Sequence, residues 1–148
     1  MSPRALGPMF HWTSEEWATH IVNNGQRANM SPLGNYGPGL YLTSRHEEAH
    51  TYASGRNSSS AVVEGHLSDP RVHDLTREDQ QQLDDIYVQN AAKKDGSYRR
   101  ALNSFSAQFR KQGYNLLRNP STGFHVAIRP NVFMPTKVHY PGETVELR

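Results

Sequence analysis

Two short segments carry side chains suited to holding a flat, polar ligand. The first is Phe10-His11-Trp12-Thr13, and the second is Gly39-Leu40-Tyr41-Leu42, which completes a Gly-Pro-Gly turn. Because this turn leads directly into a short apolar run, we expect Tyr41 to lie on a strand where its flat ring can face a ligand. Tyr52 follows eleven residues later, across a predicted helix that begins at Ser44.

These motifs resemble those of the ADP-ribosyltransferase superfamily, in the His-Tyr branch that contains diphtheria toxin, the poly-ADP-ribose polymerases and the rifamycin-modifying transferases. That branch has a His-Gly-(Ser/Thr) at the end of its first strand, then a Gly-x-Gly-(Ile/Leu)-Tyr strand, and then a helix with a second tyrosine. Trp12 replaces the family's glycine after the histidine. The matching positions are His11, Thr13, Gly37, Gly39, Leu40, Tyr41 and Tyr52. From residue 61 onward the resemblance extends only to the order of elements.

The resemblance implies that NAD is the substrate and that no metal is needed. It implies that His11 hydrogen-bonds a ribose hydroxyl, that the backbone at Trp12 grips the carboxamide, and that Tyr41 and Tyr52 stack on the nicotinamide. The predicted NAD-binding residues are His11, Trp12, Thr13, Gly39, Tyr41 and Tyr52. In such a site the protein accelerates the reaction by orienting NAD. Trp12 and Tyr52 also fit a role in core packing.

The sequence offers three candidates for the acidic member of the site. Many relatives have a glutamate on a late strand, and aligning that strand with residues 125–130 puts Phe124 at the glutamate position. Rifamycin-modifying relatives have an aspartate in a segment that 68–74 resembles, so Asp69 is the predicted third catalytic residue beside His11 and Tyr41. Glu64 and Glu143 are alternatives, and Asp69-Pro70 also fits an ordinary turn.

The missing late glutamate bears on the predicted reaction. Elongation of poly-ADP-ribose needs that group to activate the incoming hydroxyl, so chain synthesis is not expected. The prediction is mono-ADP-ribosyl transfer, a pentosyl transfer that releases nicotinamide, to a protein, nucleic acid or small-molecule acceptor. NAD hydrolysis is a related outcome.

Two rival functions are consistent with the same residues. His46-Glu47-Glu48-Ala49-His50 matches the zinc-protease helix pattern His-Glu-x-x-His, which supplies two ligands and a general base, although spacing locates no third ligand. A non-catalytic member of the transferase fold that binds NAD or ADP-ribose is the second rival. It is suggested by Trp12 and Phe124.

The elements that must position these residues follow from hydrophobic spacing and turn signals. The sequence predicts a strand at 9–12, a helix from Thr13 or Ser14 to Asn24, a loop at 26–39 and a strand at 40–43. A helix from Ser44 to about residue 53 and a strand at 61–67 follow. Residues 76–112 read as two helices broken at Asp95-Gly96, and the last predicted strands are 113–117, 124–128 and 137–140. The expected fold is α+β, an ADP-ribosyltransferase-like split β-sheet core with flanking helices and a helical insertion.

Composition sets the remaining expectations. The 148 residues fit one domain, 1–148, and the lack of cysteine excludes disulfides, thiolate metal sites and a cysteine nucleophile. The net charge of +2 does not indicate nucleic acid, and no apolar run suits a membrane span, so a soluble protein without a membrane partner is predicted. The small size of the chain, and the toxin or effector role that is common among members of the family it resembles, suggest a bacterial toxin or effector. A secretion system would deliver it into the cytoplasm of a target cell. An immunity protein or a host target would be its partner.

Overall fold

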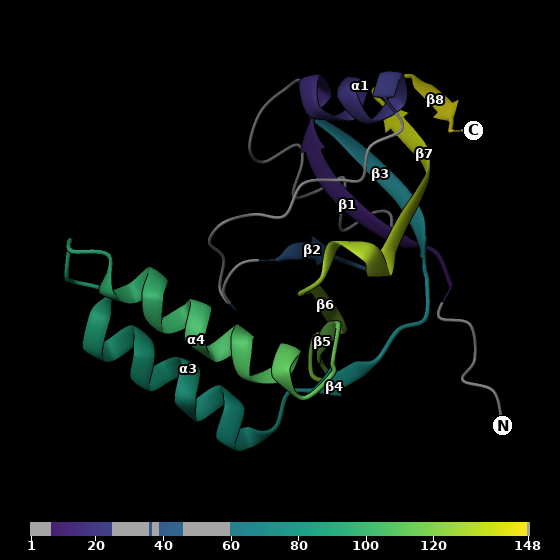
Figure 1. Ribbon diagram of the computed structural model, residues 1–148. Coiled ribbons are helices and arrows are strands. Elements are labelled where there is room, and N and C mark those ends of the chain that lie inside the picture. Colours follow the sequence, from purple (N-terminus) through teal and green to yellow (C-terminus); the bar gives the residue numbers. More distant parts are fainter. Residues whose placement is uncertain (1–6, 25–35, 37–38, 46–59, 148) are drawn as a thin grey trace, which may run out of the picture.

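The structure is a computed structural model that describes residues 7–24, 36, 39–45 and 60–147. Strands and helices alternate irregularly along the chain, so the fold is α+β (Figure 1). In chain order the described elements are β1 (Met9–Ser14), α1 (Glu15–Asn24), β2 (Leu40–Leu42), β3 (Ser60–Leu67), β4 (Val72–Asp74), α3 (Arg77–Asn90), α4 (Ser97–Lys111), β5 (Leu116–Asn119), β6 (Phe124–Ala127), the 3₁₀ turn η1 (Pro130–Val132), β7 (Phe133–Tyr140) and β8 (Glu143–Glu146).

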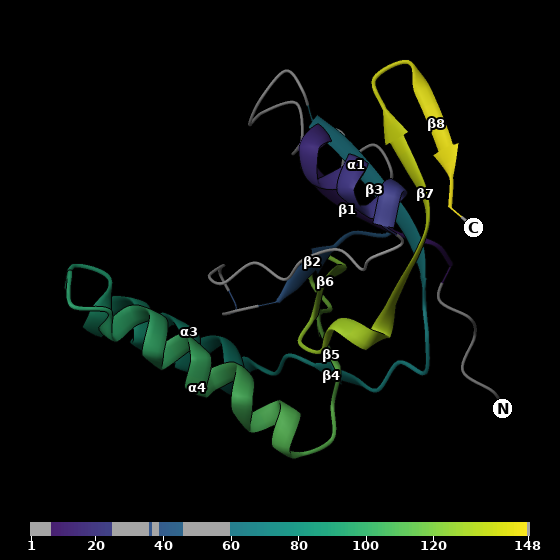
Figure 2. The same ribbon diagram turned by 45° about the horizontal axis from the view of Figure 1, so that its top comes forward.

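The first sheet has the strand order β1-β3-β7-β8, and all its neighbouring strands are antiparallel. Helix α1 lies against β1, β3 and β7 (Figures 1 and 2). Ser14 caps this helix, because its Oγ accepts a hydrogen bond of 3.2 Å from the backbone N–H of Trp17. Ala18 and Ile21 of α1 are buried in one cluster with Val63 and Val138, so apolar contacts attach the helix to the sheet.

The second sheet has the order β2-β6-β5-β4, and β4 runs parallel to β5. A parallel pair needs a long crossover, which the helical hairpin α3–α4 provides. Figures 1 and 2 show this hairpin reaching outward from the second sheet. The buried apolar side chains of the hairpin are Leu83 of α3 and Leu102, Phe105 and Phe109 of α4. They pack in one cluster with Leu75, Leu117, Val126 and Ile128.

The two sheets meet where β1 approaches β2. Backbone hydrogen bonds join Phe10 and Thr43 in both directions, at 2.8 and 2.9 Å, and form an isolated antiparallel bridge. A shared apolar core lies between the sheets and includes Met9 from β1 and Leu40 and Leu42 from β2. The bridge therefore fixes the start of β1 against the end of β2.

Most predicted elements are confirmed, with β1, α1, β2, β3, α3, α4 and β6 at or close to their expected positions. Thr76 caps α3, and Gly96 precedes α4 at the predicted break. The predicted helix after Ser44 and most of the loop at 26–39 lie outside the described residues. No helix in the described ranges is both long and apolar enough to cross a membrane.

Three strand predictions need correction. The strand expected at 113–117 begins only at Leu116, because Gly113 is left-handed, with φ at 94°. Strand β7 starts at Phe133 rather than at residue 137, because a register shift beside Gly65 accommodates Pro135. Strands β4 and β8 were not predicted, since both are short and polar edge strands that lack an alternating apolar pattern.

Candidate functional site

The predicted residues His11 and Tyr41 come together where the two sheets separate. Apart from the Phe10–Thr43 bridge, no backbone pairing joins β1 and β2 in the described residues. Instead, Nδ1 of His11 lies 2.9 Å from the backbone oxygen of Tyr41. A carbonyl oxygen can only accept, so Nδ1 carries the hydrogen and donates it. In a neutral imidazole this leaves Nε2 as the acceptor nitrogen.

The Tyr41 side chain lies on the face of the second sheet that packs against the helical hairpin. Its hydroxyl accepts a hydrogen bond of 3.0 Å from the backbone N–H of Tyr36. Burial, the main cause, raises the pKa of the Tyr41 phenol far above its ordinary value. The phenol therefore stays protonated at physiological pH and presents a neutral aromatic ring.

Further aromatic side chains surround Tyr41. The ring of Tyr36 stacks on that of Tyr41, with centroids 6.3 Å apart and an interplanar angle of 25°. Phe124 meets Tyr41 edge to face at 6.3 Å and meets Trp12 edge to face at 5.8 Å. Asn119 donates a hydrogen bond of 3.0 Å to the hydroxyl of Tyr36. We call His11, Trp12, Tyr36, Tyr41 and Phe124 the aromatic site.

The sequence prediction did not include Tyr36, Phe124 or Asn119 as members of the site. Phe124 had been aligned with the family's glutamate position, and in the structure its ring contacts that of Tyr41. For Tyr36 the sequence showed only a tyrosine in the glycine-rich loop at 26–39. For Asn119 it showed only an asparagine in an Asn-Pro turn. Neither signal specifies a contact, because Asn119 and Tyr36 are 83 residues apart in the chain.

Gly39 positions β2 by allowing close packing rather than by unusual backbone angles. A Cβ atom at this position would lie 2.9 Å from the backbone oxygen of Ala127 and would collide with Cγ1 of Val126. Only glycine fits such a close approach without a shift of the neighbouring strand. The glycine therefore lets Tyr41 pair with Val126 in the register that the structure has.

Trp12 and Thr13 lie on β1 beside His11. Trp12 pairs with Val62 and packs against a buried cluster of Phe10 and Val62. Its side chain thus contributes to the core while one edge contacts Phe124. Thr13 is half-buried and pairs with Ala61 near the end of the strand.

The structure does not bring Asp69 to the aromatic site. Asp69 is exposed and has a left-handed backbone, with φ at 48°, and its backbone oxygen accepts a hydrogen bond of 3.0 Å from Asn115. It lies three residues before the start of β4, which is three strand spacings, roughly 14 Å, from β2 in the second sheet. In this position Asp69 serves as a turn residue.

The two alternative acids also have other surroundings. Glu64 accepts a hydrogen bond of 2.8 Å from Nε2 of His139, and both side chains are 17% exposed. Nδ1 of the same ring lies 3.0 Å from the hydroxyl of Thr144. Glu143 is exposed on the edge strand β8. Glu64 is therefore engaged within the first sheet.

Tyr52 and the His46-Glu47-x-x-His50 pattern of the protease hypothesis lie outside the described residues. Across the ranges that the structure describes, no three histidine or acidic side chains gather in a metal-binding arrangement.

Comparisons with known proteins identify no family for this chain. No protein-family model matches it, and no curated protein matches it. A solved structure titled as the crystal structure of the M. tuberculosis MbcT–MbcA toxin–antitoxin complex aligns over 90% of this chain and 83% of that chain. That alignment has 13% sequence identity and a TM-score of 0.47.

Proposed function

We propose that this protein is an NAD-dependent mono-ADP-ribosyltransferase whose nicotinamide end binds at the aromatic site. The observation that carries the proposal is the hydrogen bond of 2.9 Å between His11 and the backbone of Tyr41, at the point where β1 and β2 part. It joins the two most specific residues of the sequence resemblance, which are 30 positions apart.

The tautomer of His11 suits the role that the resemblance gives it. Because Nδ1 donates to the Tyr41 carbonyl, a neutral His11 has an acceptor nitrogen for a ribose hydroxyl. The Tyr41 phenol remains neutral, and its neighbours Tyr36 and Phe124 supply further aromatic surface. Together these groups orient a nicotinamide ring and its ribose, which is the main form of catalysis that such a site offers.

In the proposed reaction the bond between the nicotinamide nitrogen and ribose C1′ breaks, and nicotinamide leaves with the electron pair. A nucleophile then bonds to C1′ and loses its proton to water. Phe124 brings a phenyl ring to the position that many relatives give to a glutamate. The site therefore lacks at this position the carboxylate that would activate an acceptor hydroxyl, which favours a single transfer or hydrolysis over polymer synthesis.

The wider biological role remains part of the same proposal. We propose a toxin or effector that modifies a protein, nucleic acid or small molecule, and that pairs with an immunity protein or a host target. Phe124 also favours a second candidate function, in which the site binds NAD or an ADP-ribose group without cleaving it.

The test is to incubate the purified chain with NAD and measure nicotinamide release, with and without a cell lysate. Tyr41→Ala should abolish release because it removes the stacking ring. His66→Ala is the matched control, since His66 is an exposed histidine on β3. Addition of a chelator should leave the rate unchanged, whereas a zinc enzyme would lose its activity.

The outcomes separate the candidates. Release that depends on Tyr41 and not on His66 supports the transferase or hydrolase. Calorimetric binding of NAD without release supports the binding-only function. If NAD neither binds nor is cleaved, the proposal is wrong.

A further inference from the structure

The outer end of the hairpin α3–α4 carries an exposed apolar centre. Val88 is 80% exposed and Tyr87 is 61% exposed, more than any other large apolar side chain in the described part of the chain. Both views in Figures 1 and 2 show this end of the hairpin far from the two sheets. Single apolar side chains are common on protein surfaces, so the charges beside Val88 decide what this one can bind.

Carboxylates lie on the outer face of α3, which is set by helical spacing. Leu83 is buried and Ile86 packs against the same cluster, so this stripe faces inward. Val88 lies on the opposite face, five residues after Leu83, and Asp84 precedes it by one turn on that face. Asp85 flanks them, and Asp84, Asp85 and Val88 are all exposed. The outer face therefore presents two carboxylates directly before Val88.

Two lysines lie on the other side of Val88. Lys93 and Lys94 are exposed in the turn just past the end of α3. Asp84 lies nine residues before Lys93, which is roughly 13 Å along a helix, so these two charges are too far apart to pair within one hairpin.

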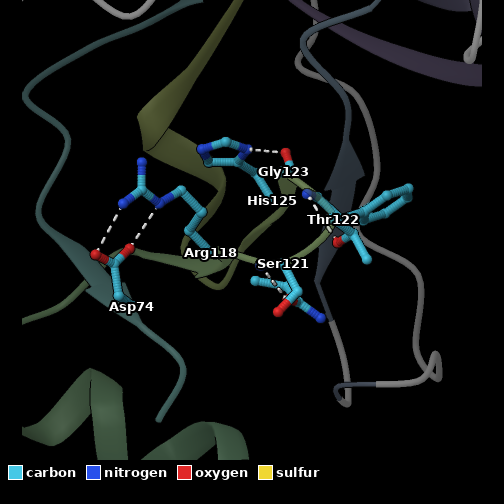
Figure 3. A network of polar contacts seen from close by, with 8 residues as sticks. Asp74, Arg118, Ser121, Thr122, Gly123 and His125 are labelled. Carbon is cyan, nitrogen blue, oxygen red and sulfur yellow. Dashed lines mark hydrogen bonds and ion pairs between the residues drawn. The ribbon is translucent and has the colours of Figure 1, made fainter.

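These charges have no ionic partner among the described residues. In the second sheet, Nε and Nη2 of Arg118 bind the carboxylate of Asp74 in a fork, at 2.6 and 2.8 Å (Figure 3). By contrast, no ion pair within the described ranges includes Asp84, Lys93 or Lys94. Isolated surface charges contribute little by themselves, so their order along the hairpin is the informative feature. That order is acidic, apolar and then basic.

A second copy of the same surface matches this order. Asp84 and Asp85 lie about 4.5–6 Å before Val88 along the helix axis, and the lysines lie beyond it on long, flexible side chains. When two α3 helices lie antiparallel with a two-fold axis at Val88, the acids of each copy face the lysines of the other. The contact then forms twice, and every charge in it meets its opposite. A purely acidic partner, such as a nucleic acid, would match the lysines but meet the carboxylates.

We propose that this chain forms a dimer through antiparallel contact of the outer faces of two α3 helices, centred on Val88. Tyr87, whose ring meets that of Tyr98 edge to face at 6.1 Å, borders the contact. One helix from each copy makes an interface below the standard size, so the dimer should be weak and reversible. Because its charges are exposed, salt should weaken it further.

The test measures the mass of the purified full-length chain by sedimentation equilibrium over a series of protein concentrations. We expect a monomer–dimer equilibrium with a dissociation constant below about 1 mM at about 0.1 M salt. At about 1 M salt, where the Debye length falls to about 3 Å, the dissociation constant should rise at least about tenfold. Val88→Ser should also raise it at least about tenfold, because the two-fold axis doubles the lost apolar contact. Lys111→Glu, exposed at the opposite end of the hairpin, is the matched control and should not change it.

Charge reversal identifies the pairing. One variant combines Lys93→Glu with Lys94→Glu, and the other combines Asp84→Lys with Asp85→Lys. Each variant alone should dimerise at least about tenfold more weakly, since like charges then face each other. An equimolar mixture of the two should form a heterodimer as stable as the unchanged dimer, because both charge pairs are again opposite. All these positions are exposed, and circular dichroism checks that the helices remain.

The proposal is overturned if the unchanged chain stays monomeric up to about 1 mM, or if the mixture of reversed variants does not restore the dimer. A dimer that neither Val88→Ser nor charge reversal weakens would form through another surface, and would also overturn it. None of these substitutions is in the aromatic site, so nicotinamide release tests the proposed function separately.

Discussion

Replacing His11 by asparagine should separate the structural role of this side chain from its chemical role. The asparagine amide nitrogen is as many bonds from Cα as Nδ1 of histidine, so it can still donate to the backbone oxygen of Tyr41. It has no counterpart of Nε2. Glutamine reaches farther and places its amide near the Nε2 position, and alanine has neither group.

The hydrogen bond sets the size of the expected stability effects. Removing its donor deletes this hydrogen bond from the half-buried seam between the sheets. Such a loss costs about 1–3 kcal/mol of unfolding free energy. His11→Ala and His11→Gln should show this loss, whereas His11→Asn should stay within about 0.5 kcal/mol of the unchanged protein.

The activity should follow a different order. If Nε2 of His11 accepts a hydrogen bond from a ribose hydroxyl, His11→Asn and His11→Ala lose that contact in the transition state, whereas the amide oxygen of His11→Gln can still accept it. Nicotinamide release by His11→Asn should then fall at least about tenfold, equivalent to about 1.4 kcal/mol, although its stability is preserved.

Urea unfolding followed by circular dichroism and a chromatographic assay of nicotinamide provide the two measurements. The structural reasoning is refuted if His11→Asn is as unstable as His11→Ala. The chemical reasoning is refuted if His11→Asn releases nicotinamide at the unchanged rate.

Three further predictions follow, two at the aromatic site and strand β2 and one at the start of helix α3. Tyr41→Phe should lose about 1 kcal/mol of stability through its hydrogen bond with Tyr36 but keep most nicotinamide release, because the ring remains; urea unfolding and the same assay check both. Gly39→Ala should lower the unfolding free energy by about 1–3 kcal/mol, because a Cβ collides with β6; unchanged thermal melting would contradict this packing argument. Burial by itself would raise the pKa of Asp79, but hydrogen bonds from Thr76 and His73 outweigh it and lower the pKa. Asp79→Ala should therefore lower the free energy of unfolding by about 1–2 kcal/mol at pH 7. This difference should shrink once the pH is below about 3.9, the ordinary pKa of aspartate, and should vanish below the lowered pKa of the folded protein. Unfolding curves of both proteins at several pH values would test this sign, and a difference that persists in acid would show it to be wrong.

Local sequence patterns were sufficient to predict most of the elements. The apolar spacing of α4 depends only on nearby positions, so it was readable without a structure. The short strands β4 and β8 were not, because a few polar residues at a sheet edge have no period of their own.

The sequence by itself determined which residues had the right chemistry for the site. Through its resemblance to the transferase family it singled out His11 and Tyr41 and aligned Phe124 with the position where many relatives have a glutamate, and it gave the glycine before β2. These features belong to single positions or to neighbours in the chain.

Only the tertiary structure decided which of these residues meet. It joined His11 to the backbone of Tyr41, added Tyr36 and Phe124 around it, and put Asp69 near the far edge of the second sheet. The pairing order of strands depends on burying apolar faces that are distant in the chain. A strand pattern shows which face is apolar but does not name the neighbouring strand, so these contacts could not be read from the sequence.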